Sequence, residues 1–296
     1  MANSNGWGDG AANNTIGWGQ GANNDIGWGD SQKKSYAGLT DIVGIDSDAQ
    51  AFITAAAITD PVQINAIKSL VTGLKTDGTW SKMKAIYPFV GGTATAHKYN
   101  LKDPRDLDAA FRLVFNGGWT HSSTGATPNG TNGVANTYFN PSLHNISNSS
   151  HISNYSRTLF ADSINGVIEI GCLSSGGSQR NIINSSFNGT TYCLPNNNNE
   201  IVVNFASNGV GFYLASRTSS TAIMGQRNST QFTGSATTFR LNQVVGIGAA
   251  GLGGAWSFYS PRQTAFSSIG DGLTDTEAAN LYTRVQAFQT SLSRQV

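Results

Sequence analysis

The sequence predicts a mainly β protein whose body is an antiparallel β-sandwich. Three observations lead to this fold class. Charged residues make up only 12% of the 296 residues, about half the usual share of a soluble domain. The 35 glycines are spread along the whole chain, which suits many tight turns better than long charged helices. Short apolar runs separated by polar, turn-forming segments fill the chain after residue 88.

We expect three regions along the chain. Residues 1–45 form a Gly/Asn/Trp repeat segment, residues 46–88 a small helical collar, and residues 89–296 the sandwich with a C-terminal helix. Hydrophobic residues make up 39% of the chain, which is enough for a packed core in the third region.

The first region contains an internal repeat. Residues 13–19 (NNTIGWG) return as residues 23–29 (NNDIGWG), and a degenerate first copy ends at residue 8. So few aliphatic residues cannot form a core, whereas a Trp between glycines offers an apolar anchor on a backbone that bends easily. We expect a docking peptide that orders on a partner; a flexible tail is the alternative. The expected anchor residues are Trp7, Ile16, Trp18, Ile26 and Trp28.

The second region has the pattern of two helices. Asp followed by Pro at residues 60–61 predicts a helix start, because Asp caps helices and Pro is favoured at the first helical position. Apolar residues follow at helical spacing over residues 62–74, and Asp-Gly at 77–78 ends the run. An earlier helix is expected over residues 49–58, and a short apolar turn over residues 80–87.

Strand patterns recur in the third region. Apolar residues alternate with the other face over residues 201–205 and 210–215, as a half-buried strand requires. Residues 111–115 and 167–172 also have strand character, and polar segments such as residues 122–133 predict long loops. Several short strands separated by turns indicate an antiparallel sandwich.

The chain closes with a clear helix pattern. Thr274 and Glu277 form a capping box, and an apolar stripe follows at helical spacing. We expect the stripe to pack on the sandwich; contact with symmetry mates in a trimer is the alternative. The stripe consists of Leu281, Val285, Phe288 and Leu292.

Charge and hydropathy argue against two classes of partner. The formal net charge is +1 and the basic residues are scattered, whereas phosphate binding needs a clustered basic patch. The most apolar stretch, residues 244–256, carries five glycines in thirteen residues and is too short to span a bilayer. The first residues have neither the basic nor the apolar part of a signal peptide. We expect a protein made in the cytoplasm that binds neither nucleic acid nor membrane.

The carboxylates do not predict an enzyme. A glycoside hydrolase needs two acids that flank the scissile bond, and the chain has only Glu169, Glu200 and Glu277. Glu277 belongs to the capping box, and Glu169, between two isoleucines, is expected to be an exposed strand residue. No Gly-x-Ser-x-Gly elbow and no phosphate loop is present. We therefore expect a non-enzymatic protein without a cofactor.

Two sets of side chains are weak candidates for metal binding. The acids of residues 103–108 (DPRDLD) offer oxygen ligands, but their spacing does not match an EF-hand loop, and a turn with a helix start is expected. The histidines have no zinc spacing, and two lie in Ser/Asn-rich stretches where a surface or turn role is expected. These residues are Asp103, Asp106, Asp108, His97, His121, His144 and His151.

Cys172 and Cys193 are the only cysteines. Each lies near an expected strand, so a disulfide is sterically possible. Cytoplasmic thiols usually stay reduced, and we therefore expect both to be free.

Several segments resemble virion proteins of tailed phages that infect Bacteroidetes, including crAss-like phages. They are the repeats above, residues 87–104 (YPFVGGTATAHKYNLKDP), residues 115–121 (FNGGWTH) and the ending from residue 269 (IGDGLTDTE) to residue 290. The resemblance implies a concanavalin or laminin-G-like jelly roll with a strand, turn and strand over residues 216–228. It also implies mounting on the head or tail of the particle, commonly as a fibre-like oligomer, and offers no catalytic residues.

We therefore expect a non-enzymatic virion protein, a head or tail fibre or appendage, assembled in the host cytoplasm. Residues 1–45 are expected to dock on other virion proteins, and the chain is expected to form a homo-oligomer, a trimer. The sandwich is expected to face outward and to bind host surface glycans. A purely structural decoration protein is the alternative, followed by a polysaccharide depolymerase.

Aromatic rings in or beside polar loops are the candidates for glycan binding, because such rings stack on sugars. For Trp119 and Trp256, a place in the core is the alternative. The candidate glycan-binding residues are Trp119, Tyr138 and Tyr155.

Overall fold

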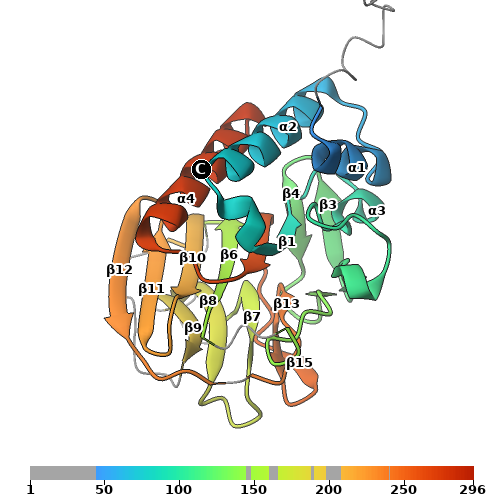
Figure 1. Cartoon of the computed structure of the whole chain (residues 1–296). Helices are drawn as coiled ribbons and strands as arrows, with labels where there is room; N and C mark the ends of the chain where they lie inside the picture. Colours follow the sequence, from blue (N-terminus) through green and yellow to red (C-terminus); the bar gives the residue numbers. More distant parts are fainter. Residues whose placement is uncertain (1–44, 145–147, 160–165, 188–189, 198–207, 240) are drawn as a thin grey trace, which may run out of the picture. The chain divides into compact units, whose positions relative to one another are not determined.

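The computed structural model describes residues 45–296, apart from residues 145–147, 160–165, 188–189, 198–207 and 240. By its contacts the chain divides into residues 1–45 and residues 46–296. The second unit contains two sheets and a group of helices (Figure 1). The expected strand at residues 201–205 lies outside the described residues.

Sheet 1 has eight strands. They are β1 (Met83–Tyr87), β3 (Trp119–Ser122), β4 (Gly125–Pro128), β6 (Ser150–Ser156), β10 (Gly211–Arg217), β11 (Ala222–Arg227), β12 (Thr230–Ser235) and β16 (Thr264–Gly270). Their order is β12-β11-β10-β6-β16-β4-β3, and β1 also pairs with β16. All these pairings are antiparallel. The hairpin of β10 and β11 is the strand, turn and strand expected over residues 216–228.

Sheet 2 also has eight strands. They are β2 (Val114–Asn116), β5 (Val134–Asn136), β7 (Ile170–Leu173), β8 (Arg180–Phe187), β9 (Thr190–Asn197), β13 (Gly246–Ile247), β14 (Ala250–Leu252) and β15 (Ala255–Ser257). The path β15-β14-β7-β13-β5-β2 is extended by β8 beside β7 and by β9 beside β8. The β14–β7 pairing is parallel and the others are antiparallel. The predicted fold class, a mainly β sandwich with a C-terminal helix, is confirmed.

The helices are α1 (Ser47–Ala55), α2 (Pro61–Thr76), α3 (Ala94–His97) and α4 (Asp275–Ser291), with 3-10 turns η1 (Thr79–Lys82) and η2 (Asp108–Ala110). Local capping explains where the long ones begin. Asp60 accepts a hydrogen bond from the Val62 N–H before α2, and Thr274 and Glu277 form the predicted capping box of α4.

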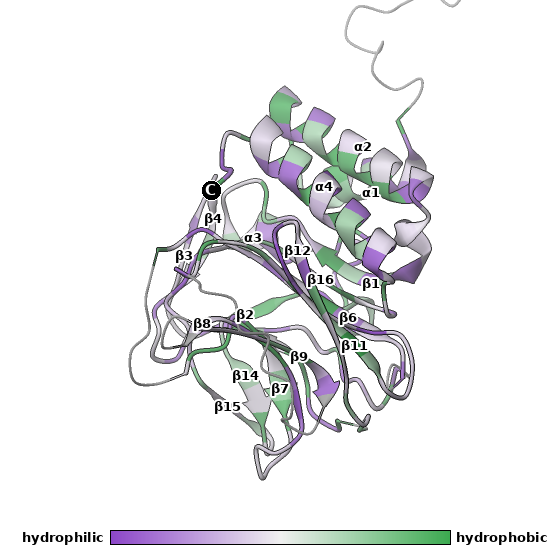
Figure 2. Ribbon diagram, turned by 90° about the vertical axis from the view of Figure 1, so that its left-hand side faces the viewer, coloured by the Kyte–Doolittle hydropathy of each residue, from purple (hydrophilic) through white to green (hydrophobic). Residues whose placement is uncertain are grey.

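The helices α2 and α4 form a third layer over the outer face of sheet 1 (Figure 2). The stripe residues Leu281 and Val285 of α4 are fully buried, and the Phe288 ring meets Phe266 of β16 at 6.4 Å between centroids. The expected packing of this helix on the sandwich is confirmed. Since the stripe is covered within the chain, it is not available for the alternative trimer contact.

The end of the expected collar belongs to the sandwich. Residues 83–87 were expected to continue a short turn, but they form β1, which pairs with β16 from Met83 opposite Gly270 to Tyr87 opposite Ser267. The expectation failed because the partner strand lies far along the chain, where local sequence gives no sign of it.

Strand β10 is buried at every position, which the alternating pattern did not predict. Phe212 faces the helices, where its ring lies 5.8 Å from that of Tyr282. Tyr213 and Ala215 instead join the core between the sheets. A sheet covered on both faces has no polar side.

Candidate functional site

Trp119 lies on β3, the end strand of sheet 1, and is half-buried. Its ring packs edge-on against Phe115 of β2, with 5.1 Å between centroids, so it bridges the end strands of the two sheets. The ring also lies against Gly248, where a Cβ would come within 2.9 Å of it. Its indole N–H donates to the Asn116 carbonyl at 3.1 Å. These contacts hold the ring in one orientation at the rim of the sandwich.

Two turns flank this ring and pack on each other. Asn129 Oδ1 accepts hydrogen bonds from the N–H groups of residues 131–133 at 3.0–3.1 Å, and its Nδ2 donates to Asn132 Oδ1 at 2.8 Å. The Gly118 N–H donates to the same Asn132 oxygen at 3.0 Å. Asn116 and Asn132 are exposed. Within the described ranges, Asn116 Oδ1 and Asn132 Nδ2 have no hydrogen-bond partner. We call Trp119, Asn116 and Asn132 the Trp119 rim.

A pair of histidines begins at the Trp119 ring. His121 stacks on it at 6.1 Å between centroids, and the Nδ1 atoms of His97 and His121 are 2.9 Å apart. Burial lowers the pKa of His97 to about 3, helped by the nearby positive charges, and burial also lowers the pKa of His121. Both rings are therefore neutral at pH 7, so one Nδ1–H donates to the other. No pattern in the sequence indicates this pair, because the two histidines are 24 residues apart.

The other predicted glycan-binding residues lie elsewhere. Tyr138 is half-buried in a left-handed conformation (φ 55°). Tyr155 is fully buried, and its hydroxyl donates to the Val296 carbonyl and accepts from the Val296 N–H. A ring so enclosed offers no face to a sugar, so the Tyr155 prediction is corrected. Trp256, like Trp119, is half-buried rather than in the core, and packs on Gly246.

The predicted anchor residues lie outside the described residues. They are Trp7, Ile16, Trp18, Ile26 and Trp28. Their proposed role therefore depends on the sequence pattern. In the described part of the chain, no helix has both the length and the apolarity of a membrane span.

Glu169 is not the exposed strand residue that was expected. It is 3% exposed and forms an ion pair with Arg262, which is 2% exposed. The Ser185 N–H donates to the second oxygen of Glu169 at 2.7 Å, and Arg262 donates to the Ser186 carbonyl at 2.8 Å. The partner lies 93 residues away in sequence. The carboxylate is sealed inside the sandwich and has no contact with a substrate-accessible surface.

The remaining carboxylates that sequence singled out are also engaged. Glu277 accepts from Lys82 at 2.6 Å as well as closing the capping box, while Glu200 is outside the described residues. Asp106 pairs with Lys98 at 2.5 Å and with Arg112 at 2.8 Å. In the described part of the chain no three His, Cys, Asp or Glu side chains gather as a metal site would require.

The other candidates of the sequence have structural surroundings. Asp103 pairs with Arg105 at 2.5 Å, and Asp108 begins η2 as a turn and helix start. His151 is fully buried, in contrast to the expected surface or turn role. Cys172 and Cys193 are free and buried, as expected; burial raises the pKa of both thiols, that of Cys193 to about 12.

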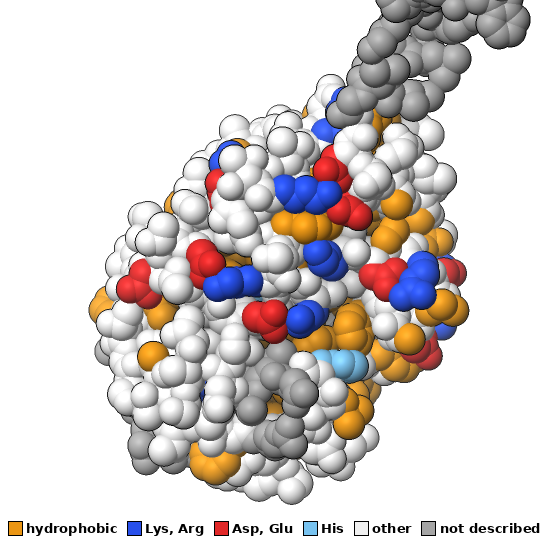
Figure 3. Space-filling view, viewed as in Figure 1, with side chains coloured by type: hydrophobic (Ala, Val, Ile, Leu, Met, Phe, Trp, Pro, Cys, Tyr) orange, Lys and Arg blue, Asp and Glu red, His pale blue; other side chains and the backbone are white. Residues whose placement is uncertain are grey.

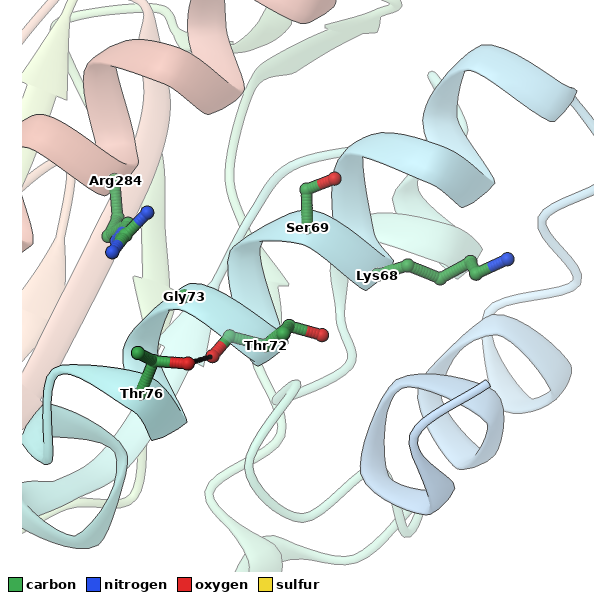
Figure 4. A pocket seen from close by; sticks show the side chains of 6 residues that line it. All are labelled: Lys68, Ser69, Thr72, Gly73, Thr76 and Arg284. Carbon is green, nitrogen blue, oxygen red and sulfur yellow. Dashed lines mark hydrogen bonds between the residues drawn. The ribbon is translucent and has the colours of Figure 1, made fainter. Parts of the chain in front are cut away.

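A shallow groove of 460 Å³ crosses the helical layer between α2 and α4 (Figure 4). Arg284 crosses α2 at Gly73, where a Cβ would lie 2.6 Å from the Arg284 Cδ. Two hydrogen bonds of 2.7 and 2.8 Å tie Arg284 to Asp77, and they lower the pKa of that carboxyl. The lining has hydroxyl groups and no aromatic ring, so it is unsuited to stacking on a sugar. It consists of Lys68, Ser69, Thr72, Gly73, Thr76 and Arg284.

The described part of residues 46–296 thus forms a two-sheet sandwich with a helical layer on one face and an aromatic rim at one edge. Neither a protein-family model nor a curated protein sequence matches the chain. Partial similarity in fold links it to several solved structures. Domain 4 of an extracellular arabinanase from Geobacillus stearothermophilus, in complex with arabinotriose, has 13% identity over 68% of this chain and 98% of its own, with a TM-score of 0.46.

Two further structures are similar at the same level. A Trypanosoma rangeli sialidase in complex with sialic acid has 11% identity over 74% of this chain and 38% of its own, with a TM-score of 0.48. The Ruminococcus gnavus IT-sialidase CBM40 domain bound to alpha2,3 sialyllactose has 14% identity over 46% of this chain and 82% of its own, with a TM-score of 0.34. Likeness at this level carries no argument about function.

Proposed function

We propose that this protein is a non-enzymatic, glycan-binding appendage of a bacteriophage particle. Its sandwich binds host surface glycans at the Trp119 rim, and residues 1–45 dock on other virion proteins. The chain is assembled in the host cytoplasm and carried on the head or tail of the virion.

The Trp119 rim carries the glycan part of this proposal. An aromatic ring packs well on the C–H face of a sugar, while amide groups hydrogen-bond the hydroxyls around it. Trp119 supplies a partly exposed ring, and Asn116 Oδ1 and Asn132 Nδ2 supply an acceptor and a donor beside it. Because the ring and both turns are already held by contacts within the chain, binding costs little side-chain ordering.

The carboxylates support a binding role rather than hydrolysis. Hydrolysis of a glycosidic bond needs two acids about 5 to 10 Å apart across a site that the sugar can enter. Glu169 is sealed in the sandwich by Arg262, and Glu277 is held by Lys82 and the start of α4. A depolymerase would release reducing ends from host capsule, and we expect none.

A glycan array probed with the full chain tests the binding proposal. We expect signal for a subset of host surface glycans, confirmed by calorimetry with the best ligand. The variant Trp119→Ala is expected to bind about tenfold more weakly, which corresponds to about 1.4 kcal/mol. Asn116→Ala, which removes only one exposed amide, is expected to weaken binding less and to leave stability unchanged.

Trp256→Ala is the matched control. Trp256 is also half-buried and packs on a glycine of the same segment, residues 246–251, so its loss lowers stability in a comparable way. If both Trp variants lose binding equally, the effect is one of stability and the Trp119 rim is not the site. An array without signal above background would instead favour a purely structural decoration protein.

Incorporation into particles tests the docking part separately. Deleting residues 1–30 removes all three Gly-Trp-Gly units. We expect the shortened protein to bind the same glycans in solution but to be missing from purified virions. If it still enters particles, the repeats are not the anchor.

A further inference from the structure

Asparagine followed by glycine occurs four times in the described residues, and three of these pairs lie in the turns around Trp119. The pairs are at residues 116–117, 129–130, 132–133 and 208–209. Asn-Gly is the pair most prone to deamidation, in which the glycine nitrogen attacks the side-chain amide of the asparagine. Glycine favours the attack because no side chain shields its nitrogen and its backbone turns easily. The four pairs differ in how firmly the amide is held.

In three of the pairs several hydrogen bonds hold the amide in place. Asn129 Oδ1 accepts three backbone N–H groups at 3.0–3.1 Å. Asn132 Oδ1 accepts two hydrogen bonds, at 3.0 and 2.8 Å, and the N–H of the following Gly133 is itself bound to Asn129. Asn208 Oδ1 also accepts two, at 3.3 and 3.1 Å. Each amide must break these bonds before it can turn towards the next nitrogen.

Asn116 is held much less firmly. Its Nδ2 donates to the Val114 carbonyl at 3.1 Å, and no described residue bonds its Oδ1. The side chain is exposed, and Asn116 is the last residue of β2, a three-residue strand at the end of sheet 2. The end of such a strand opens locally at little cost. The Asn116 amide therefore reaches the Gly117 nitrogen more readily than the other three amides reach theirs.

We propose that Asn116 is a site of spontaneous deamidation, which changes the charge and the shape of the Trp119 rim with time. The Gly117 nitrogen bonds to Asn116 Cγ, the Cγ–Nδ2 bond breaks, and ammonia leaves with the proton of the Gly117 N–H. Water then opens the cyclic imide at either of its carbonyls, which gives aspartate or isoaspartate. The reaction consumes water and releases ammonia, without oxidation or reduction.

Both products change the rim. Each carries a carboxylate in place of the neutral amide, since an aspartate side chain is ionised at pH 7. Isoaspartate also reroutes the main chain through the former side chain. Its free carboxylate then contains the oxygen that accepts the Trp119 indole N–H at 3.1 Å, so the contact that orients the ring is altered. The resulting loss of glycan binding rests on the proposed function, whereas the deamidation itself does not.

The turn that builds the rim requires the reactive glycine. Gly117 has a left-handed conformation (φ 73°), and a Cβ there would lie 2.0 Å from the Asn132 carbonyl oxygen. A larger residue at position 117 would therefore strain the backbone and push the two turns apart. The chain cannot slow the reaction by replacing this glycine without disturbing the rim.

Peptide mapping by mass spectrometry of the full chain, incubated at neutral to mildly basic pH, tests the proposal. We expect the mass gain of an amide-to-acid conversion at Asn116 at least about tenfold faster than at the other three asparagines. In urea, where the fold no longer holds any amide, the four pairs should react at similar rates. Equal rates in the folded chain, or no reaction at Asn116, would overturn the proposal.

The variant Asn116→Gln tests the consequence for the rim. Ring closure through the longer side chain is slow, so its glycan affinity, whatever its initial value, should stay constant over the incubation. The parent should lose affinity at least about threefold as Asn116 reacts. The control Asn208→Gln, which changes a held amide outside the Trp119 rim, should age as the parent does.

These readouts keep the two proposals apart. Peptide mapping needs no glycan, so an array without signal leaves the test of deamidation intact. If Asn116 reacts and the parent keeps its full glycan affinity, the proposed change of the Trp119 rim is wrong. If Asn116→Gln loses affinity as fast as the parent, the loss comes from another part of the chain and the proposed role of Asn116 in it fails.

Discussion

Charged side chains of the helical layer lie at the surface, whereas those in the interior of the sandwich are buried. Around the helices, ion pairs lie at the surface, as with Lys75 between Asp46 and Asp48 at 2.7 and 2.6 Å. Figure 3 shows blue and red side chains together over this half of the molecule, while the lower sandwich surface in that view is mostly uncharged. Inside the sandwich, Glu169 and Arg262 form an ion pair away from water.

This difference separates charges that keep a surface soluble from charges on which the fold depends. Exposed pairs gain little, because water and salt screen them and the side chains lose freedom. A buried pair has already lost its hydration, so removing one partner leaves an uncompensated charge in the interior. An ion pair at the surface and an ion pair inside the sandwich therefore have very different effects on the free energy of unfolding.

The largest effect is expected for Glu169→Ala. This change leaves Arg262 buried without its carboxylate, and we expect the free energy of unfolding to fall by about 3–5 kcal/mol. Urea denaturation of the purified chain measures it. The double variant Glu169→Met with Arg262→Met should recover most of that loss, because similar apolar volumes replace both charges. A double variant no more stable than Glu169→Ala would contradict the role given to the pair.

A smaller effect concerns acid, through His151 of β6. The His151 Nδ1–H donates to the Asp271 carbonyl at 2.6 Å, and its Nε2 accepts from Ser268 at 3.0 Å. Burial lowers the pKa of His151 from 6.5 to about 4. The folded state therefore favours the neutral ring, and the resulting stability is complete above pH 6.5 and lost as the pH falls towards about 4.

We expect this loss to amount to about 3 kcal/mol. Comparing unfolding at pH 7 and pH 4 in the parent and in His151→Gln measures it, because all other titrating groups are shared. The variant should be less stable at pH 7 but should lose about 3 kcal/mol less on acidification. Parallel losses in the two proteins would show that His151 does not cause the acid sensitivity.

The smallest effect is expected for Lys75→Met in the helical layer. The Lys75 ammonium group pairs with Asp46 and Asp48, but its side chain is 33% exposed. We expect unfolding free energy to change by less than about 1 kcal/mol. Adding salt should narrow even that difference, which thermal unfolding at low and high salt can follow. A loss as large as that for Glu169→Ala would remove the distinction between the two regions.

The sequence predicted the helix starts, because the residues that cap a helix lie within one turn of its first residue. Asp60 caps α2 through the N–H two residues on, and Thr274 and Glu277 act within one turn. Both helix starts are therefore visible in the sequence. The apolar stripe of α4 also predicted that this helix packs on the sandwich, although not on which strands.

The features that sequence missed depend on partners far along the chain. Glu169 was misplaced because Arg262 covers it from 93 residues away, and Tyr155 because Val296 lies 141 residues beyond it. Trp119 was correctly associated with polar loops, whereas its contact with Gly248 depends on how the two sheets come together. Local patterns cannot show such contacts, since many distant segments have the same composition.

The position of β16 has a consequence for how the protein is made. This strand pairs with β6 on one side and with β4 and β1 on the other, although it comes last of the strands. A ribosome needs on the order of ten seconds to travel from β1 to β16. Throughout that time the strands on either side of the gap have exposed edges. Correct assembly of sheet 1 therefore requires that wrong pairing at these edges is slower than the synthesis of β16.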